Sequence, residues 1–159
     1  MKLRLFHAKI LSAPDAEPFD GELHIEGGKI VYAGSTDSAK DFSADREVDC
    51  GGNLLMSSFC NAHAHSAMCL FRGIADDLPL EDWLYDRIFP LEKNLTQDDV
   101  YWGTMLQIAE YVRNGITCVA DMYFYPEAVV AAAKNADLCL ALCYPSNSYA
   151  KGDILSVIE

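Results

Sequence analysis

The sequence predicts an α/β protein in which a small β-layer, residues 1–55, precedes β/α units over residues 56–159. Short extended segments separated by glycine turns dominate the first part, which is typical of antiparallel strands. Apolar runs then alternate with helix-length periodic segments, which is typical of βαβ units around a parallel sheet. The composition, with 51% hydrophobic and 23% charged residues, is that of a chain that folds into a packed core.

Within residues 1–55 the clearest predicted element is a β-hairpin. Residues 23–26 alternate apolar and polar side chains, and residues 29–33 resume the extended pattern. Gly27 and Gly28 between them supply a two-residue turn that tolerates positive φ. Further strands are predicted around Leu3 and Leu5, at residues 47–49 and at residues 54–56.

Beyond residue 55 the predicted order is strand, helix, strand, helix, strand. The first helix begins at Thr96, whose hydroxyl can accept a hydrogen bond from the amide of Asp99, and it ends at Asn114 and Gly115. Pro126 favours the first turn of the second helix. The predicted ranges are 56–62, 116–120 and 138–143 for the strands, and 96–114 and 126–135 for the helices.

A long connection, residues 66–95, separates the first predicted strand from the helix that begins at Thr96. We expect a short helix within it, around residues 80–88, closed by Pro90. Connections of this length inside a compact domain are usually functional. Its acidic side chains are interpreted as a solvated face: Asp76, Asp77, Glu81 and Asp82.

The charge balance argues against several classes of partner. The chain has 24 acidic against 12 basic residues, a formal net charge of −12, and its local basic cluster is only Lys2 with Arg4. Nucleic acids and anionic membranes require many clustered basic side chains, so neither is an expected partner. Because the N-terminus does not resemble a signal peptide, we expect a cytoplasmic protein. Its six cysteines are interpreted as buried thiols in a reducing compartment, rather than as a zinc or redox site.

The sharpest local feature is the stretch Asn61-Ala62-His63-Ala64-His65, at the carboxyl end of the first predicted parallel strand. Residues i and i+2 of a strand point to the same face, so two imidazoles can converge on one metal ion. A hydrogen-bonded pair of structural histidines is the alternative. Active sites of parallel α/β proteins gather at this end of the strands, which favours a pair of metal ligands. His7 and His24, in the β-layer, are interpreted as surface residues.

Residues 61–124 resemble the amidohydrolase superfamily and, within it, the methylthioadenosine/S-adenosylhomocysteine deaminase and chlorohydrolase-like subgroup. The resemblance rests on the HxH pair, on LFRGIADDLPLEDWL at residues 70–84 and on the Pro-Leu-Glu that follows at residues 90–92. Residues 25–31, IEGGKIV, also resemble the opening strands of that family. The resemblance implies a (β/α)₈ barrel together with a β-sandwich assembled from both ends of the chain.

The resemblance also implies roles for four residues. His63 and His65 would be the first two ligands of one divalent metal ion, most often Zn²⁺, which makes hydroxide available near neutral pH for attack on C6 of an adenine ring. Glu92 matches a glutamate that accepts hydrogen bonds from ribose hydroxyls, and Trp83 matches an aromatic residue of the loop that covers the nucleoside. The alternatives are an exposed loop carboxylate for Glu92 and helix packing for Trp83.

A complete barrel needs roughly 250 residues, whereas only residues 56–159 follow the β-layer. We therefore expect the N-terminal part of a deaminase, with three of the eight barrel strands. The catalytic acid/base and the remaining metal ligands are expected beyond residue 159, so this chain alone is expected to be inactive. The expected partners are a nucleoside substrate and the remainder of the barrel or another chain, and the complete protein is expected to form a homo-oligomer.

The sequence departs from the family pattern at two places, of which only Tyr144 bears on the substrate. Ser57 and Ser58 stand where relatives usually have Pro-Gly, and Tyr144 stands where nucleoside-handling relatives can carry an arginine. Asp121, at the end of the second parallel strand, is interpreted as a carboxylate that holds backbone. The alternative functions are a chlorohydrolase or a guanine or other ring deaminase on the same fold, and a non-catalytic partial barrel that binds a partner through its open sheet edges.

Overall fold

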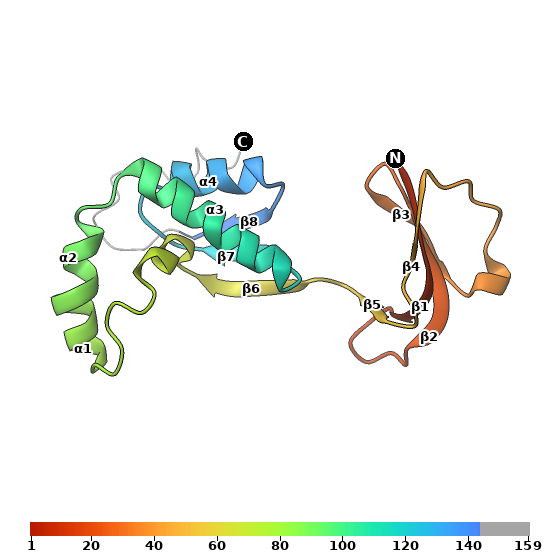
Figure 1. The fold of residues 1–159 in the computed structure, drawn as a ribbon, viewed down its shortest axis with the longest axis horizontal. Coiled ribbons are helices and arrows are strands. Elements are labelled where there is room, and N and C mark those ends of the chain that lie inside the picture. Colours follow the sequence, from red (N-terminus) through yellow and green to blue (C-terminus); the bar gives the residue numbers. More distant parts are fainter. Residues whose placement is uncertain (144–159) are drawn as a thin grey trace. The chain divides into compact units, whose positions relative to one another are not determined.

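The computed structural model describes residues 1–143, which form two compact units, Met1–Ser57 and a second unit that begins at Ser58. The predicted boundary, after residue 55, lies two residues earlier. Each unit is built around a sheet of its own (Figure 1). The mixed α/β class is confirmed, whereas closure of the second sheet into a barrel stays a prediction.

The first unit is a five-stranded sheet in the order β3-β2-β1-β4, with β5 also paired to β1. The first strand runs antiparallel to β2 and parallel to β4 and β5. The predicted hairpin is confirmed, since Gly27 and Gly28 turn between β2 and β3 with φ of 59° and 78°. The second layer of the expected sandwich stays a prediction. The strands are β1 (Lys2–Leu11), β2 (Phe19–Glu26), β3 (Lys29–Gly34), β4 (Arg46–Asp49) and β5 (Leu54–Met56).

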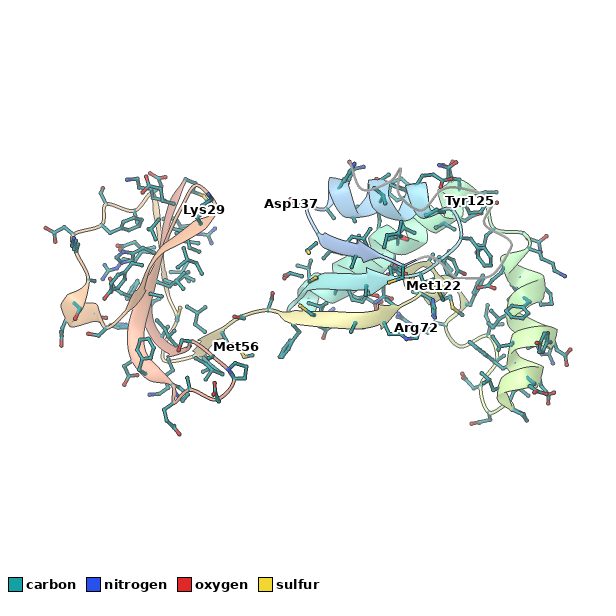
Figure 2. The ribbon with its side chains drawn as sticks, turned by 180° about the vertical axis from the view of Figure 1, so that it is seen from behind. Lys29, Met56, Arg72, Met122, Tyr125 and Asp137 are labelled. Carbon is teal, nitrogen blue, oxygen red and sulfur yellow. The ribbon has the colours of Figure 1, made fainter. Side chains whose placement is uncertain are left out.

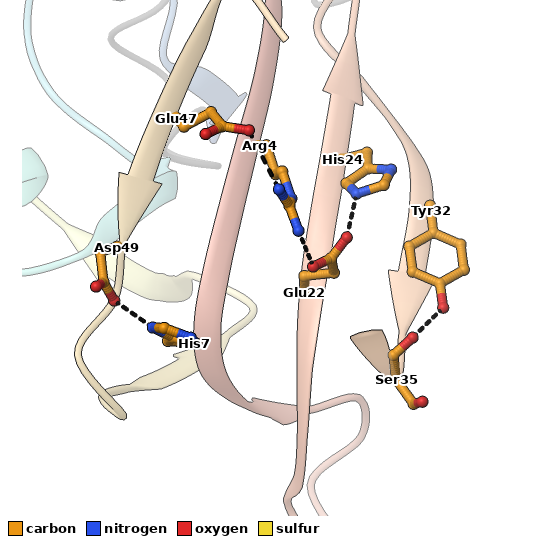
Figure 3. A network of polar contacts seen from close by, with 8 residues as sticks. All are labelled: Arg4, His7, Glu22, His24, Tyr32, Ser35, Glu47 and Asp49. Carbon is orange, nitrogen blue, oxygen red and sulfur yellow. Dashed lines mark hydrogen bonds and ion pairs between the residues drawn. The ribbon is translucent and has the colours of Figure 1, made fainter. Parts of the chain in front are cut away.

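A buried polar network lies on one face of this sheet (Figure 3). His24, predicted at the surface, is only 3% exposed and stacks on Phe42. Its Nε2 donates to Glu22 at 2.7 Å, and Arg4 donates to the other oxygen of Glu22 at 2.6 Å, so that charge is balanced within the network. The prediction for His24 was wrong because the alternation of β2 shows which residues share a face but not what covers it. His7 is exposed, as predicted.

The second unit contains a parallel sheet in the order β6-β7-β8, with α3 and α4 on one face (Figure 1). Ala64 and Val119 of the sheet pack against Ile108, Tyr111 and Ala132 of the two helices. The predicted order of strands and helices is confirmed. The elements are β6 (Phe59–Ala64), α3 (Gln97–Arg113), β7 (Ile116–Asp121), α4 (Pro126–Asn135) and β8 (Cys139–Leu142).

Helix α3, which was predicted to begin at Thr96, has Thr96 as its N-cap residue. The hydroxyl of Thr96 accepts from the amide of Asp99 at 3.2 Å, and the carboxylate of Asp99 accepts from the amide of Thr96 at 2.8 Å. This reciprocal pair satisfies two donors that the helix start would otherwise leave unpaired. Among residues 1–143 no helix is both long and apolar enough to span a bilayer.

Two predicted boundaries were wrong. The first parallel strand begins at Phe59 instead of residue 56, because residues 54–56 pair with β1 in the other unit's sheet. The helical segment of the long connection was predicted to end at Ile88. It consists of α1 (Leu80–Asp82), a π-helical stretch (Trp83–Ile88) and α2 (Phe89–Glu92), and therefore ends at Glu92. Pro90 lies inside α2, where the missing N–H of a first-turn proline is tolerated.

The cysteines are less buried than predicted, with three exposed and three partly buried, and none forms a disulfide. Cys60, Cys118 and Cys139 lie in register across β6, β7 and β8. They occupy the face opposite Val119, which α3 and α4 do not cover, and the sulfur atoms of Cys118 and Cys139 are 3.3 Å apart. The prediction of burial assumed that both faces of the sheet are covered, as is usual for apolar parallel strands. Here α3 and α4 cover one face only, so cysteines on the other face are exposed or partly buried.

Candidate functional site

The two histidines of the HxH motif converge at the end of β6. Their Nε2 atoms are 3.1 Å apart, and the planes of the rings are nearly perpendicular, at 89°. Two nitrogen ligands of one tetrahedral zinc ion, each at about 2.0–2.1 Å, lie roughly 3.3 Å from one another. The observed separation of His63 and His65 therefore fits a shared metal ion.

A hydrogen bond on its far side fixes the tautomer of His65. Its Nδ1 lies 2.7 Å from the carbonyl oxygen of Met122. Met122, labelled in Figure 2, is the residue that follows β7. Because a carbonyl can only accept, Nδ1 carries a proton, and in the neutral ring Nε2 then has the lone pair that a metal ligand needs. Sequence reasoning missed Met122 because it contributes backbone, for which its side chain gives no signal.

The end of β6 is also tied to the end of β7 by backbone contacts. Asp121 is 1% exposed, and its two carboxylate oxygens accept from the amide of Ser66 at 3.2 and 3.3 Å. The amide of Met122 donates to the carbonyl of Ala64 at 3.1 Å. The prediction that Asp121 holds backbone is confirmed, and the residues on both sides of His65 are fixed as a result.

Glu92, the last residue of α2, accepts a hydrogen bond from a residue that follows β7. The hydroxyl of Tyr123 donates to its Oε1 at 2.9 Å. Burial and then the neighbouring Glu92 raise the pKa of Tyr123 far above its usual value, so this hydroxyl stays protonated and can serve as a donor. A carboxylate has about four lone-pair sites. Glu92 therefore keeps the capacity to accept from two further hydroxyls.

Glu92 faces a cavity of about 650 Å³ whose other lining is largely aromatic. Such a lining, with Glu92 and Lys93 as its charged residues, suits a flat ring system that carries hydroxyls. Trp83 lines a different cavity, of about 300 Å³, together with Met68 and Arg72. The structure therefore does not bring Trp83 and Glu92 into one pocket. The residues that share the cavity of Glu92 are Tyr85, Phe89, Lys93, Leu95, Phe124 and Tyr125.

Alone, His63 and His65 would fill only part of a metal site. Within residues 1–143 no group of three or more His, Cys, Asp or Glu side chains is placed to hold a metal ion. Tyr144, which bears on the substrate assignment, lies outside the described residues. Two imidazoles occupy half of a tetrahedral site, so further ligands are needed for tight binding.

Comparison with known proteins identifies close relatives. The chain is 48% identical over 127 residues to a 5-methylthioadenosine/S-adenosylhomocysteine deaminase of Syntrophobacter fumaroxidans. It is 45% identical over 125 residues to a 5′-deoxyadenosine deaminase of Methanococcoides burtonii. Each alignment covers 79% of this chain, but only 29% and 28% of the respective relative.

A solved structure and a family match agree with these relatives. An adenosine deaminase from Xanthomonas campestris with bound zinc has a TM-score of 0.81 and 34% identity, over 87% of this chain and 32% of that one. The chain thus spans about a third or less of the length of the proteins it matches. Residues 54–154 match the amidohydrolase family over well more than half of the chain. This chain therefore belongs to the amidohydrolase family.

Proposed function

We propose that the complete protein hydrolytically deaminates an aminopurine nucleoside of the adenosine, methylthioadenosine or S-adenosylhomocysteine type. The observation that carries the proposal is the imidazole pair, in which the carbonyl oxygen of Met122 accepts from Nδ1 of His65 while Nε2 of His65 lies 3.1 Å from Nε2 of His63. The relatives named above, which are deaminases of such nucleosides, support this substrate class.

We infer that His63 and His65 hold one divalent metal ion, with Zn²⁺ as the preferred ion. Neutral imidazole nitrogen is a good ligand for zinc, and the zinc in the related adenosine deaminase structure supports the choice. When bound, the ion supplies Lewis-acid activation of water for hydrolysis. We assign its remaining ligands, and the acid/base that moves the proton, to the rest of the barrel.

Glu92 is proposed to bind the ribose. A vicinal diol can donate two hydrogen bonds to one carboxylate, and Glu92 combines this capacity with a place in an aromatic-lined cavity. Trp83, at the start of the same helical segment, is proposed as an aromatic residue of the loop over the nucleoside. Both assignments concern orientation of the substrate, because within residues 1–143 neither side chain is hydrogen-bonded to the imidazole pair.

We further propose that the rest of a (β/α)₈ barrel covers the open face of the β6-β7-β8 sheet. That face carries Cys60, Cys118 and Cys139, and the helices α3 and α4 leave it uncovered. The covering strands would come from the remainder of a longer protein or from another chain. A complete barrel needs roughly 250 residues, so the second unit would supply its first three β/α units.

The proposal is tested with Glu92→Ala in the full-length protein. Hydrogen bonds to a charged acceptor are worth about 1.5–3 kcal/mol, so kcat/KM for an adenosine-type nucleoside should fall roughly ten- to a hundredfold. Glu81→Ala, in the exposed acidic part of the long connection, is the matched control and should leave kcat/KM unchanged.

Two results would overturn this reading. If Glu92→Ala leaves nucleoside deamination unchanged, Glu92 does not bind the ribose. If the wild-type protein acts only on guanine or on chlorinated rings, the function is that of a ring deaminase or chlorohydrolase on the same fold. Ammonia release and chloride release, measured over a panel of nucleosides, free bases and chlorinated rings, distinguish these outcomes.

A further inference from the structure

We propose that Tyr123 is a positioning residue that sets the orientation of Glu92 for binding the ribose diol. The inference rests on the proposed function, since it takes Glu92 as the acceptor of the substrate hydroxyls. What it adds is a second residue, from a different element, on which recognition of ribose depends. Its hydroxyl and Glu92 Oε1 are 2.9 Å apart although 31 residues separate them in sequence.

Three consecutive residues at the end of β7 make contacts to both halves of the site. The carboxylate of Asp121 accepts from the amide that follows His65, the carbonyl of Met122 accepts from His65 itself, and the hydroxyl of Tyr123 donates to Glu92. The metal-ligand half and the substrate half come from separate elements, β6 and α2. The end of β7 therefore provides one rigid reference for both.

Glu92 needs such a tether because of where it lies. It is the last residue of the four-residue helix α2 and is only partly buried, and within residues 1–143 Tyr123 is the one hydrogen-bond partner of its side chain. A glutamate side chain has several rotatable bonds, and fixing them is entropically costly if it must be done when substrate binds. A hydrogen bond made beforehand reduces that cost and keeps the carboxylate in the productive geometry.

Tyrosine is suited to this role for two reasons. Its ring is partly buried beside β7, which fixes the position of the hydroxyl, and the hydroxyl remains a protonated donor to an acceptor that carries charge. Phenylalanine at this position keeps the ring but removes the donor. The substitution Tyr123→Phe therefore separates positioning of Glu92 from packing of the strand end.

The test compares two substrates in the full-length enzyme: an adenosine-type ribonucleoside and its 2′,3′-dideoxy analogue, which lacks the diol. Tyr123→Phe is expected to lower the ratio of their kcat/KM values about three- to tenfold, by an effect on the ribonucleoside alone. Glu92→Ala should remove the preference for the diol, and the double variant should show no further loss. Bound metal and melting temperature, measured in parallel, are expected to stay unchanged in Tyr123→Phe.

Tyr101→Phe is the matched control, since Tyr101 uses its hydroxyl on the outer helices, where it accepts from Asn135 at 2.9 Å. This variant should keep the wild-type ratio. The positioning role is wrong if Tyr123→Phe keeps that ratio, or lowers kcat/KM equally for both substrates, while Glu92→Ala removes it. If Glu92→Ala also keeps the ratio, the ribose assignment of Glu92 has failed instead, and Tyr123 loses its proposed role with it.

Discussion

Two histidines with equally short hydrogen bonds show how differently the two units use the same side chain. His24 in β2 and His65 after β6 each have one ring nitrogen 2.7 Å from an oxygen. The partner of His24 is the carboxylate of Glu22, in a buried network that Arg4 neutralises (Figure 3). The partner of His65 is a backbone carbonyl, and its other nitrogen faces His63. In His65 the nitrogen opposite the hydrogen bond faces a second imidazole, whereas His24 lies in a network whose charges already pair with one another.

The cavities of the two units differ in the same way. A cavity of about 490 Å³ in the first unit is lined by Arg4, Glu22 and Phe42 among others, and Arg4 and Glu22 already pair with one another. In the second unit the cavity beside Glu92 contains a carboxylate with lone pairs to spare. Charged groups that satisfy each other stabilise a fold, whereas groups held in place with unused capacity can recognise a ligand.

Substitution of His65 is expected to have the largest effect. In the complete protein His65→Ala is expected to remove the bound metal and nearly all turnover, because half of the imidazole pair is lost. His24→Gln should lower stability but leave the metal bound. Metal content by mass spectrometry and ammonia release by a coupled assay measure both effects. Full metal occupancy in His65→Ala would show that the HxH pair is not the metal site.

The buried network of the first unit is broken by Glu22→Ala. This change leaves Arg4 and His24 without their shared acceptor, and we expect a loss of about 3 kcal/mol in the stability of the sheet. Asp20→Ala is the control, because its exposed carboxylate pairs with Lys9 and should contribute less than about 1 kcal/mol. Hydrogen exchange of the amides in β2 and β3 reports the loss. Equal effects of the two variants would refute the contrast.

Low pH should reduce the stabilising contribution of Glu22 by less than the Glu22→Ala substitution does. The hydrogen bond from Arg4 holds the pKa of Glu22 below its usual value of 4.5. A carboxyl whose pKa is lowered by folding contributes stability above the unfolded-state value and loses it as the pH falls through the folded-state value. The difference in unfolding free energy between wild type and Glu22→Gln should therefore shrink from neutral pH to about pH 3. Urea titrations across this range measure it, and a constant difference would contradict the assignment.

The smallest expected effect concerns the start of α3, which is set by local sequence alone. Thr96→Ala removes the capping hydroxyl and should cost about 1 kcal/mol. Gln97→Ala changes the adjacent exposed residue, which takes no part in the cap, and should have little effect. Urea unfolding followed by the fluorescence of Trp83 and Trp102, both in the second unit, compares the two. A larger loss in Gln97→Ala would rule out the capping box as the cause.

Features that depend on neighbours in sequence were predictable. The Gly27-Gly28 turn, the Thr96 cap and the order of strands and helices each follow from a few adjacent residues. The convergence of His63 and His65 was expected from the i, i+2 geometry of a strand and is observed, although β6 ends at Ala64, one residue before His65. The family match over residues 54–154 agrees with the resemblance first noted at the HxH motif and the segment after it.

Contacts between distant parts of the chain were decided by tertiary structure. Met122 reaches His65 across 57 residues because the register between β6 and β7 aligns the two strand ends, and Tyr123 reaches Glu92 across 31 residues because α2 lies beside that end. The burial of His24 depends in the same way on what covers its face of the sheet. Periodicity in a sequence determines which side chains share a face, but the partner on that face is set by register and packing, which no local pattern encodes.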